Sequence, residues 1–236
     1  MKAIAIVGKK KTGKTAMGLA LVKCLKEKGL KVGVVKHSHH GFDGVEGADT
    51  EEYKKIATSV AAYSPSQSFV SWDNEKTIQD LVPLMDVDVL VMEGGNKIGW
   101  LPRIIMVRED DDDKEFYPEL ALKQIPACTR DTPPSAEEVE KLAELVLDKG
   151  FILPGLNCGA CGRDFCMEFV ADILAGKARA SGCKAMAGEM SITCNGNELG
   201  FNPFVSDMLS AGITAMLKQL KGYVPGDIEI TIKNGS

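Results

Sequence analysis

The chain has 236 residues, 44% of them apolar, so it can bury a sizeable core and suits one α/β domain with an appendage better than two full domains. Its formal net charge of −5 argues against a general nucleic-acid-binding surface. No apolar run approaches membrane-spanning length, and lysines interrupt the N-terminal apolar stretch too soon for a secretory signal. We therefore expect a cytoplasmic protein, in which seven cysteines indicate metal or redox chemistry rather than structural disulfides.

Residues 8–15 read Gly-Lys-Lys-Lys-Thr-Gly-Lys-Thr and form a complete phosphate-binding loop, or P-loop. The loop follows the short apolar stretch 3–7 and precedes a helical pattern over 17–25, which is the strand, loop and helix context that a P-loop requires. A triphosphate would lie at the helix N-terminus, where backbone N–H groups and the positive end of the helix dipole meet the anion. The alternative is a Gly/Lys-rich turn between two core elements.

The residues of the P-loop have separate predicted roles. Gly8 and Gly13 let the backbone approach the phosphates, and Lys14 reaches the terminal phosphates. The hydroxyl of Thr15 can hold a magnesium ion. The other loop residues, which we also assign to phosphate binding, are Lys9, Lys10, Lys11 and Thr12.

Five apolar strand candidates alternate with helical segments in the first part of the chain, which predicts a mostly parallel sheet with helices on both faces. The stretch 87–92 has the strongest buried-strand pattern and ends at Glu93. The acidic run 109–113 is most simply a solvated hairpin loop. A helix over 135–149 then closes a predicted P-loop domain of residues 1–150.

Four cysteines form a second constellation, predicted as a module over 151–185. Cys158, Cys161 and Cys166 share one tight loop, and a helix returns the chain to Cys183, so that two, four and sixteen residues intervene. Three clustered thiols with one remote partner fit the four irons of a 4Fe-4S cubane, each of which requires one thiolate. Zinc sites more often use two separated pairs, and zinc or unrelated buried cysteines are the alternatives.

The tail, residues 186–236, has the pattern of a small α+β region. The sequence Cys-Asn-Gly-Asn at 194–197 predicts a hairpin turn, and Pro203 opens a helix that reaches about Leu220. The stretch 227–232 alternates in polarity and is expected to be a half-buried strand.

Carboxylates near the P-loop would be needed to manage magnesium. Glu93 stands at the C-terminal end of the central strand, where ligands of open α/β sheets bind, and could hold magnesium or position water. Its alternative role is that of a solvated acid at a strand end. Asp49 is a second magnesium candidate, whose alternative role is a helix cap.

Other polar residues could read the ligand. All three histidines lie in one stretch after the second strand, at positions 37, 39 and 40. His37, His39 and His40 could contact phosphates or a pterin, with a metal site as the minority alternative. Asp131 follows a strand, and its carboxylate could accept both the N1 and N2 hydrogens of guanine, a pairing that adenine does not offer.

Taken together, these stretches resemble the family of molybdopterin-guanine dinucleotide biosynthesis protein B, small GTP-binding P-loop proteins. The resemblance covers roughly the first 150 residues and rests on loop 8–15, on Lys-His-Ser-His-His at 36–40, on Gly-Ala-Asp-Thr at 47–50 and on the strand end at 89–94. It implies binding of GTP with Mg²⁺ and assistance to a partner, a molybdenum cofactor guanylyltransferase, that attaches GMP to molybdopterin. It also suggests a homodimer.

The chain departs from that family in two ways. Lys9, Lys10 and Lys11 occupy loop positions where the family usually has small residues. The cysteine region is an addition, and residues 153–183 resemble a separate 4Fe-4S module of anaerobic corrinoid and electron-transfer proteins.

The resemblance favours a GTP-binding accessory protein of molybdenum or tungsten cofactor maturation that carries a 4Fe-4S cluster. We expect at most a weak, partner-dependent GTPase, because the P-loop offers no evident arginine finger of its own. The first alternative is a nucleotide-gated electron donor to a redox partner, or a metallocentre-assembly NTPase. A further alternative is a non-enzymatic scaffold in which the cluster only stabilises the tail.

Overall fold

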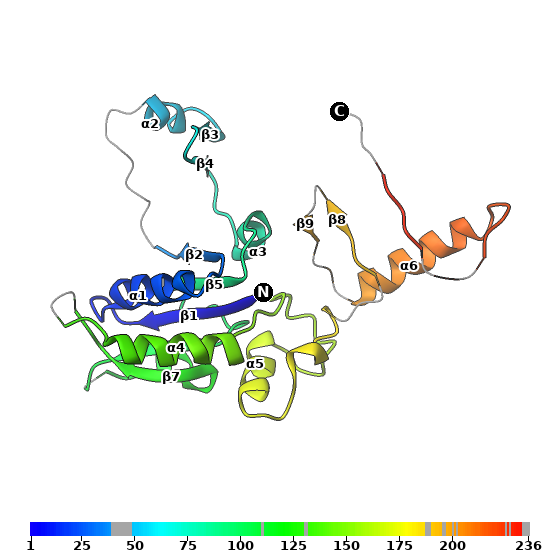
Figure 1. The fold of residues 1–236 in the computed structure, drawn as a ribbon. Coiled ribbons are helices and arrows are strands. Elements are labelled where there is room, and N and C mark those ends of the chain that lie inside the picture. Colours follow the sequence, from blue (N-terminus) through cyan, green and yellow to red (C-terminus); the bar gives the residue numbers. More distant parts are fainter. Residues whose placement is uncertain are drawn as a thin grey trace.

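The computed structural model describes residues 1–38, 49–109, 111–129, 132–186, 190–194, 197–199, 201, 203–224, 226 and 228–232. Within these ranges a central sheet has five parallel strands in the order β2-β5-β1-β6-β7 (Figure 1). The strands are β1 Lys2–Gly8, β2 Val32–Lys36, β5 Val89–Glu93, β6 Arg103–Val107 and β7 Ala121–Pro126. Ala5 of β1 lies opposite Met92 of β5 and Arg103 of β6, so the P-loop leaves the middle of the sheet. The predicted mostly parallel sheet is confirmed.

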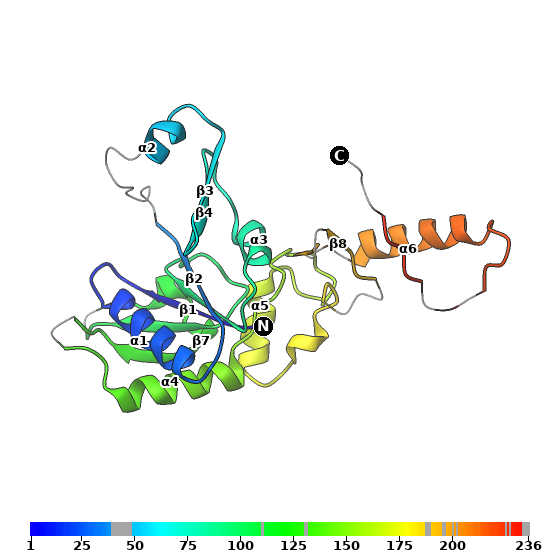
Figure 2. The same ribbon diagram turned by 45° about the horizontal axis from the view of Figure 1, so that its top comes forward.

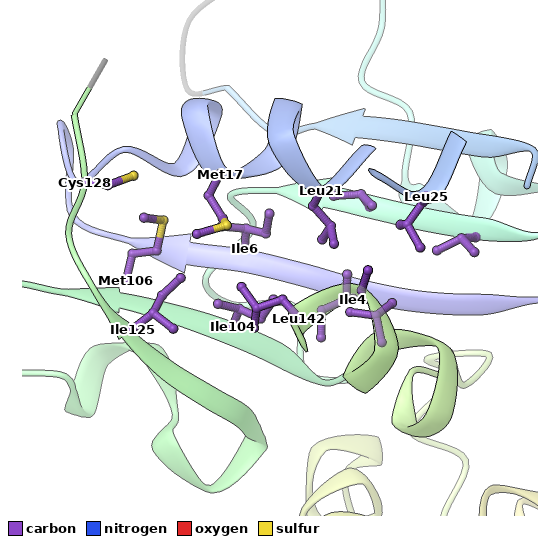
Figure 3. Packing of buried hydrophobic residues seen from close by; sticks show 14 residues of the cluster. Ile4, Ile6, Met17, Leu21, Leu25, Ile104, Met106, Ile125, Cys128 and Leu142 are labelled. Carbon is purple, nitrogen blue, oxygen red and sulfur yellow. The ribbon is translucent and has the colours of Figure 1, made fainter. Parts of the chain in front are cut away.

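One face of the sheet is covered by the helices α1 (Lys14–Glu27) and α4 (Ala136–Lys149), which pack against each other (Figure 1). Figure 3 shows the core between them and the sheet, where Ile6, Met17 and Leu142 meet. Each fully buried aliphatic side chain of this kind contributes roughly 1.5–3 kcal/mol. The opposite face is covered by the short helix α3 (Ile78–Leu81), a following 3₁₀ turn η1 (Val82–Leu84) and irregular segments.

The sequence dictates the start and the buried face of α4. The Ser135 hydroxyl accepts the Glu138 N–H at 3.2 Å, while the Glu138 carboxylate accepts the Ser135 N–H at 2.9 Å. This capping box satisfies two N–H groups that the first helical turn leaves without partners. Val139, Leu142 and Val146 recur at helical spacing and are buried against the sheet.

A separate arm projects from the main body in Figures 1 and 2. It consists of α2 (Asp49–Lys54) and of the antiparallel strands β3 (Ser59–Tyr63) and β4 (Ser68–Trp72). These strands pair only with each other among the described strands, so they do not extend the central sheet.

The acidic run does not form the hairpin loop that the sequence predicted. β6 and β7 are parallel, and parallel neighbours need a longer connection than a tight turn. Here the connection contains two 3₁₀ turns, η2 (Lys114–Phe116) and η3 (Pro118–Leu120). The side chains of Phe116 and Leu120 are fully buried and anchor this connection to the body of the protein.

The cysteine region packs beside the sheet. Its helix α5 (Cys166–Leu174) contacts η3, and the short turn η4 (Ala180–Gly182) precedes Cys183. A small core joins Leu120, Leu153 and Phe169 to the buried Cys183. This core connects the cysteine region to the loop between β6 and β7.

The tail contains the predicted hairpin and helix but lacks the predicted last strand. The hairpin pairs β8 (Thr193–Cys194) with β9 (Asn197–Glu198), and α6 (Pro203–Leu217) lies away from the central sheet in Figures 1 and 2. Residues 228–232 form no strand, and Ile230 is 49% exposed. Alternating polarity alone was therefore not enough to predict a strand, because a strand also needs a neighbouring strand with which to pair. No helix in the described ranges is long and apolar enough to cross a membrane.

Candidate functional site

Two glycines shape the P-loop backbone, and Cys128, which follows β7, packs against it. Gly8 and Gly13 have φ angles of 149° and 90°, which disfavour other residues. A Cβ at Gly13 would lie 2.2 Å from the carbonyl oxygen of Cys128. Cys128 also donates its N–H to the carbonyl of Thr12 at 3.0 Å, and Figure 3 shows its sulfur beside the start of α1. No local sequence pattern indicates this contact, because Cys128 and the P-loop are far apart along the chain.

Lys14 folds back across the loop, where its ammonium donates to the carbonyls of Gly8 at 2.8 Å and Lys9 at 2.6 Å. Burial lowers the pKa of Lys14, the carboxylate of Glu93 partly opposes this, and the charges of Lys36 and Arg108 lower the pKa further. Positive groups therefore converge on the loop from α1, β2 and the end of β6. A polyphosphate placed there would be attracted by these positive groups.

A hydroxyl and a carboxylate meet beside Lys14. The Thr15 hydroxyl donates to Oε1 of Glu93 at 2.8 Å, and the Lys36 ammonium lies 3.2 Å from the same oxygen. The N–H of His37 donates to the Glu93 carbonyl at 2.9 Å. Oxygen ligands of this kind suit Mg²⁺, which typically keeps several waters and takes one or two protein carboxylates. Glu93 thus ends β5, as the sequence predicted, and its carboxylate lies beside the first turn of α1.

Of the remaining predicted nucleotide-site residues, Asp49 is not brought to this cluster. Asp49 begins α2, and this helix lies apart from the start of α1 in Figures 1 and 2. His39, His40 and Asp131 lie outside the described residues. Their roles stay predictions.

The segment after β6 lies against the P-loop, which the sequence did not reveal. Lys9 forms an ion pair with Asp111, with Nζ 3.1 Å from Oδ1. The other carboxylate oxygen accepts the N–H of Arg108 at 3.0 Å, and this bond is the main reason why the pKa of Asp111 lies below its usual range. The Arg108 guanidinium donates to the carbonyls of Lys10 at 3.1 Å and Lys11 at 3.0 Å. Lys9 is therefore paired with a carboxylate, while its side chain remains 40% exposed.

Any affinity of this loop for a triphosphate should decline at a lower alkaline pH than it would with a lysine of ordinary pKa. The triphosphate favours the protonated Lys14, and burial lowers the pKa of this group in the ligand-free protein. The contribution of Lys14 is thus fully present below the lowered pKa and is lost as pH rises through it. Isothermal titration between neutral and alkaline pH measures this decline. The variant Lys14→Arg should bind with little pH dependence over the same range, because a guanidinium stays charged.

The four predicted cluster cysteines line one cavity beside the start of α5. The cavity is lined by the thiol-bearing residues Cys158, Cys161, Cys166 and Cys183, together with neighbours that include Leu153, Asn157, Arg163 and Phe169. No three His, Cys, Asp or Glu side chains among the described residues are drawn together closely enough to hold a single metal ion. The four thiols thus share a cavity without converging on one point.

Backbone donors and a cation surround these thiols. The N–H of Asn157 lies 3.4 Å from the sulfur of Cys166, while burial and the neighbouring thiols raise the pKa of Cys166. Arg163 donates to the carbonyl of Cys161 at 2.8 Å and forms an ion pair with Asp172. A cubane offers one iron to each of four thiolates and carries negative charge that N–H groups and cations stabilise. The residues present fit such a cluster.

The fold and these two sites define a P-loop α/β protein with an attached cysteine module. Residues 3–130, more than half of the chain, match the family model described as "Molybdopterin guanine dinucleotide synthesis protein B" (MobB), so the chain belongs to the MobB family. Residues 153–185 match a second model, described as "Putative Fe-S cluster". The predicted family and the presence of an iron-sulfur domain are confirmed.

Known relatives agree with this assignment. A protein of Methanocaldococcus jannaschii named "Putative molybdopterin-guanine dinucleotide biosynthesis adapter protein" is 25% identical over 94% of this chain and 93% of its own length. A Bacillus subtilis protein named "Probable molybdopterin-guanine dinucleotide biosynthesis adapter protein" is 27% identical over 46% of this chain and 66% of its own length. The crystal structure of Bacillus subtilis MobB has a TM-score of 0.51 at 18% identity, covering 64% of this chain and 99% of that one, and supports the fold alone.

Proposed function

We propose that this MobB-family chain binds GTP with Mg²⁺ and assists a molybdenum cofactor guanylyltransferase in attaching GMP to molybdopterin. The observation that carries the proposal is the 2.8 Å contact between the Thr15 hydroxyl and Glu93, directly beside Lys14. In a P-loop, the lysine neutralises the terminal phosphates and the hydroxyl holds magnesium. The names of the relatives supply the pathway, and the same adapter role would serve molybdenum or tungsten.

Each residue of this site has a distinct task in the proposal. Lys14 would exchange its two carbonyl partners for phosphate oxygens, and Thr15 and Glu93 would hold Mg²⁺ directly or through water. The ion would supply charge neutralisation between the phosphates. Asp131 would select guanine, and the histidines at 37, 39 and 40 would contact the last phosphate or the pterin.

The proposal is tested by nucleotide titration and by the rate of GMP attachment. GTP should bind more tightly than ATP and only weakly without Mg²⁺, and the chain should accelerate a guanylyltransferase. Lys14→Ala should abolish both effects, whereas Lys26→Ala, an exposed lysine near the other end of α1, should leave them intact. Equal binding of ATP and GTP together with an unchanged transferase rate would rule the adapter function out.

We propose in addition that Cys158, Cys161, Cys166 and Cys183 hold a 4Fe-4S cluster, one thiolate on each iron. A second function, nucleotide-gated electron donation to a redox partner, is favoured by the loop that leaves Glu93. A Cβ added at Gly99 in that loop would lie 2.6 Å from Cβ of Met167, so the loop touches α5 at the residue after Cys166.

The same loop makes a second contact with the cysteine module. Its residue Trp100 accepts the N–H of Leu153 at 2.8 Å, and a Cβ at Gly155 would lie 2.7 Å from the Trp100 ring. A change at Glu93 on nucleotide binding could therefore reach the cluster through packed side chains. Redox titration with and without GTP tests this function. A midpoint potential that does not respond to nucleotide would eliminate gated electron donation while leaving the adapter function untouched.

We also propose that the chain forms a homodimer. The arm carries exposed apolar side chains, among them Tyr63 at 92% exposure and Val70 at 51%. Apolar surface on a projecting hairpin is suited to pairing with another chain. Sedimentation of the purified protein would detect the dimer, and a monomer at micromolar concentration would contradict it.

A further inference from the structure

The turn that follows β6 places an arginine over the P-loop. Val107 ends β6, and the side chain of the next residue, Arg108, reaches the middle of the loop. There its guanidinium donates to the carbonyls of Lys10 at 3.1 Å and Lys11 at 3.0 Å through a single terminal nitrogen. A guanidinium has five N–H donors in a fixed planar fork. The two carbonyls therefore orient the group without using all of its donors.

Asp111 fixes the backbone from which this arginine projects. One carboxylate oxygen accepts the N–H of Arg108 at 3.0 Å, and the other pairs with the ammonium of Lys9 at 3.1 Å. The carboxylate is well shielded, since the side chain of Asp111 is 8% exposed. Asp111 thus holds the turn by one hydrogen bond within it and by one ion pair to the P-loop. This restraint reduces the conformational entropy lost when Arg108 binds a ligand.

The position of Arg108 relative to Lys14 indicates which part of a nucleotide it would meet. Both positive groups bond to carbonyls of the same loop, Lys14 to those of Gly8 and Lys9 and Arg108 to those of Lys10 and Lys11. The P-loop lysine reaches the β- and γ-phosphates. The guanidinium bonds to the next two carbonyls along the loop, so we expect a phosphate held by Lys14 to be the part of a nucleotide nearest to Arg108.

We propose that Arg108 is a phosphate-contacting residue of the nucleotide site, supplied by the same chain, that discriminates a triphosphate from a diphosphate, and that Asp111 positions it. The inference rests on the proposed nucleotide binding and deepens it. Asp111 does not touch the ligand; it acts by holding the Arg108 backbone and by engaging Lys9. Arginine suits this task better than lysine because its planar fork donates to two phosphate oxygens at once.

The experiment compares the affinities of a non-hydrolysable GTP analogue and of GDP, both with Mg²⁺. Arg108→Gln should weaken binding of the analogue by about ten- to a hundredfold, as expected for a lost charged hydrogen bond, and should change GDP binding far less. Arg108→Lys should recover part of the difference. Lys114→Gln removes the same charge from an exposed lysine of the same connection and should leave both affinities at the wild-type value.

A double-mutant cycle tests the positioning role. Asp111→Asn alone should reduce the preference for the triphosphate, and should add little once Arg108→Gln is present, because both changes disturb one contact. Fully additive effects would show that Asp111 does not act through Arg108. If Arg108→Gln keeps the wild-type ratio of the two affinities, the inference is wrong and the nucleotide-binding proposal survives. If the wild-type protein binds neither ligand, both fall together.

Discussion

Replacing Arg103 by leucine is expected to lower the free energy of unfolding by about 3 kcal/mol, since it leaves buried carbonyls without donors. Arg103 is fully buried, and its guanidinium donates to the carbonyls of Asn96, Ile98 and Phe116 while lying over the ring of Tyr117. Burial lowers the pKa of Arg103 to about 10. Its removal relieves that desolvation but orphans three backbone oxygens, and the second effect is the larger.

Denaturant unfolding monitored by circular dichroism measures this loss. Arg103→Lys should fall between the wild type and the leucine variant, because an ammonium keeps the charge but cannot span the same three carbonyls. Lys97→Leu is the matched control, as it makes the same chemical change at an exposed position of the same loop and should stay within about 0.5 kcal/mol of the wild type. A similar loss in both leucine variants would show that the carbonyl contacts of Arg103 are not what stabilises the loop.

The parts of the molecule that sequence predicted well are those that local chemistry determines. Gly8 and Gly13 read as a P-loop because their neighbours already had the periodicity of a strand and a helix, and the structure places this loop between β1 and α1. The helix α4 was equally readable, since Ser135 and Glu138 form a capping box within one turn. Such signals need no knowledge of the rest of the chain.

The contacts that sequence missed join residues distant along the chain. Arg108 bonds to carbonyls 97 and 98 residues away, and Cys128 lies against the loop at Gly13. The acidic run around Asp111 resembled a solvated turn because like charges in sequence suggest solvent, yet this carboxylate pairs with Lys9. Nothing in the local pattern distinguishes a carboxylate facing water from one facing a distant cation.

The burial of Arg103 in the core likewise could not be predicted from the local sequence pattern. A charged residue at the start of an apolar stretch reads as a strand end facing water, but its side chain is fully buried here. The guanidinium can be buried because three carbonyls accept its hydrogen bonds. Asn96 and Ile98, in the loop after Glu93, supply two of them, and Phe116 supplies the third. The same loop carries Trp100 onto the cysteine module, so the buried cation stabilises the connection between the two sites.

Replacing Cys183 by serine is expected to reduce the iron content from about four atoms per chain to nearly none, because a cubane needs a thiolate on each iron. Cys183 is also buried in the small core with Phe169 and Leu153, where a hydroxyl is less well accommodated than a thiol. Anaerobic purification followed by iron and sulfide determination measures the loss. Thermal unfolding of the same samples reports how far the module depends on its metal.

Cys194→Ser is the matched control, since Cys194 is exposed on β8 and does not line the cavity of the four thiols. It should retain full iron and sulfide. An equal iron loss in both variants would contradict the assignment of Cys183 as a ligand. The GTP affinity of Cys183→Ser then separates two architectures: if the loop through Trp100 couples the sites, affinity falls with the cluster, whereas an unchanged affinity means that the cluster only stabilises its own module.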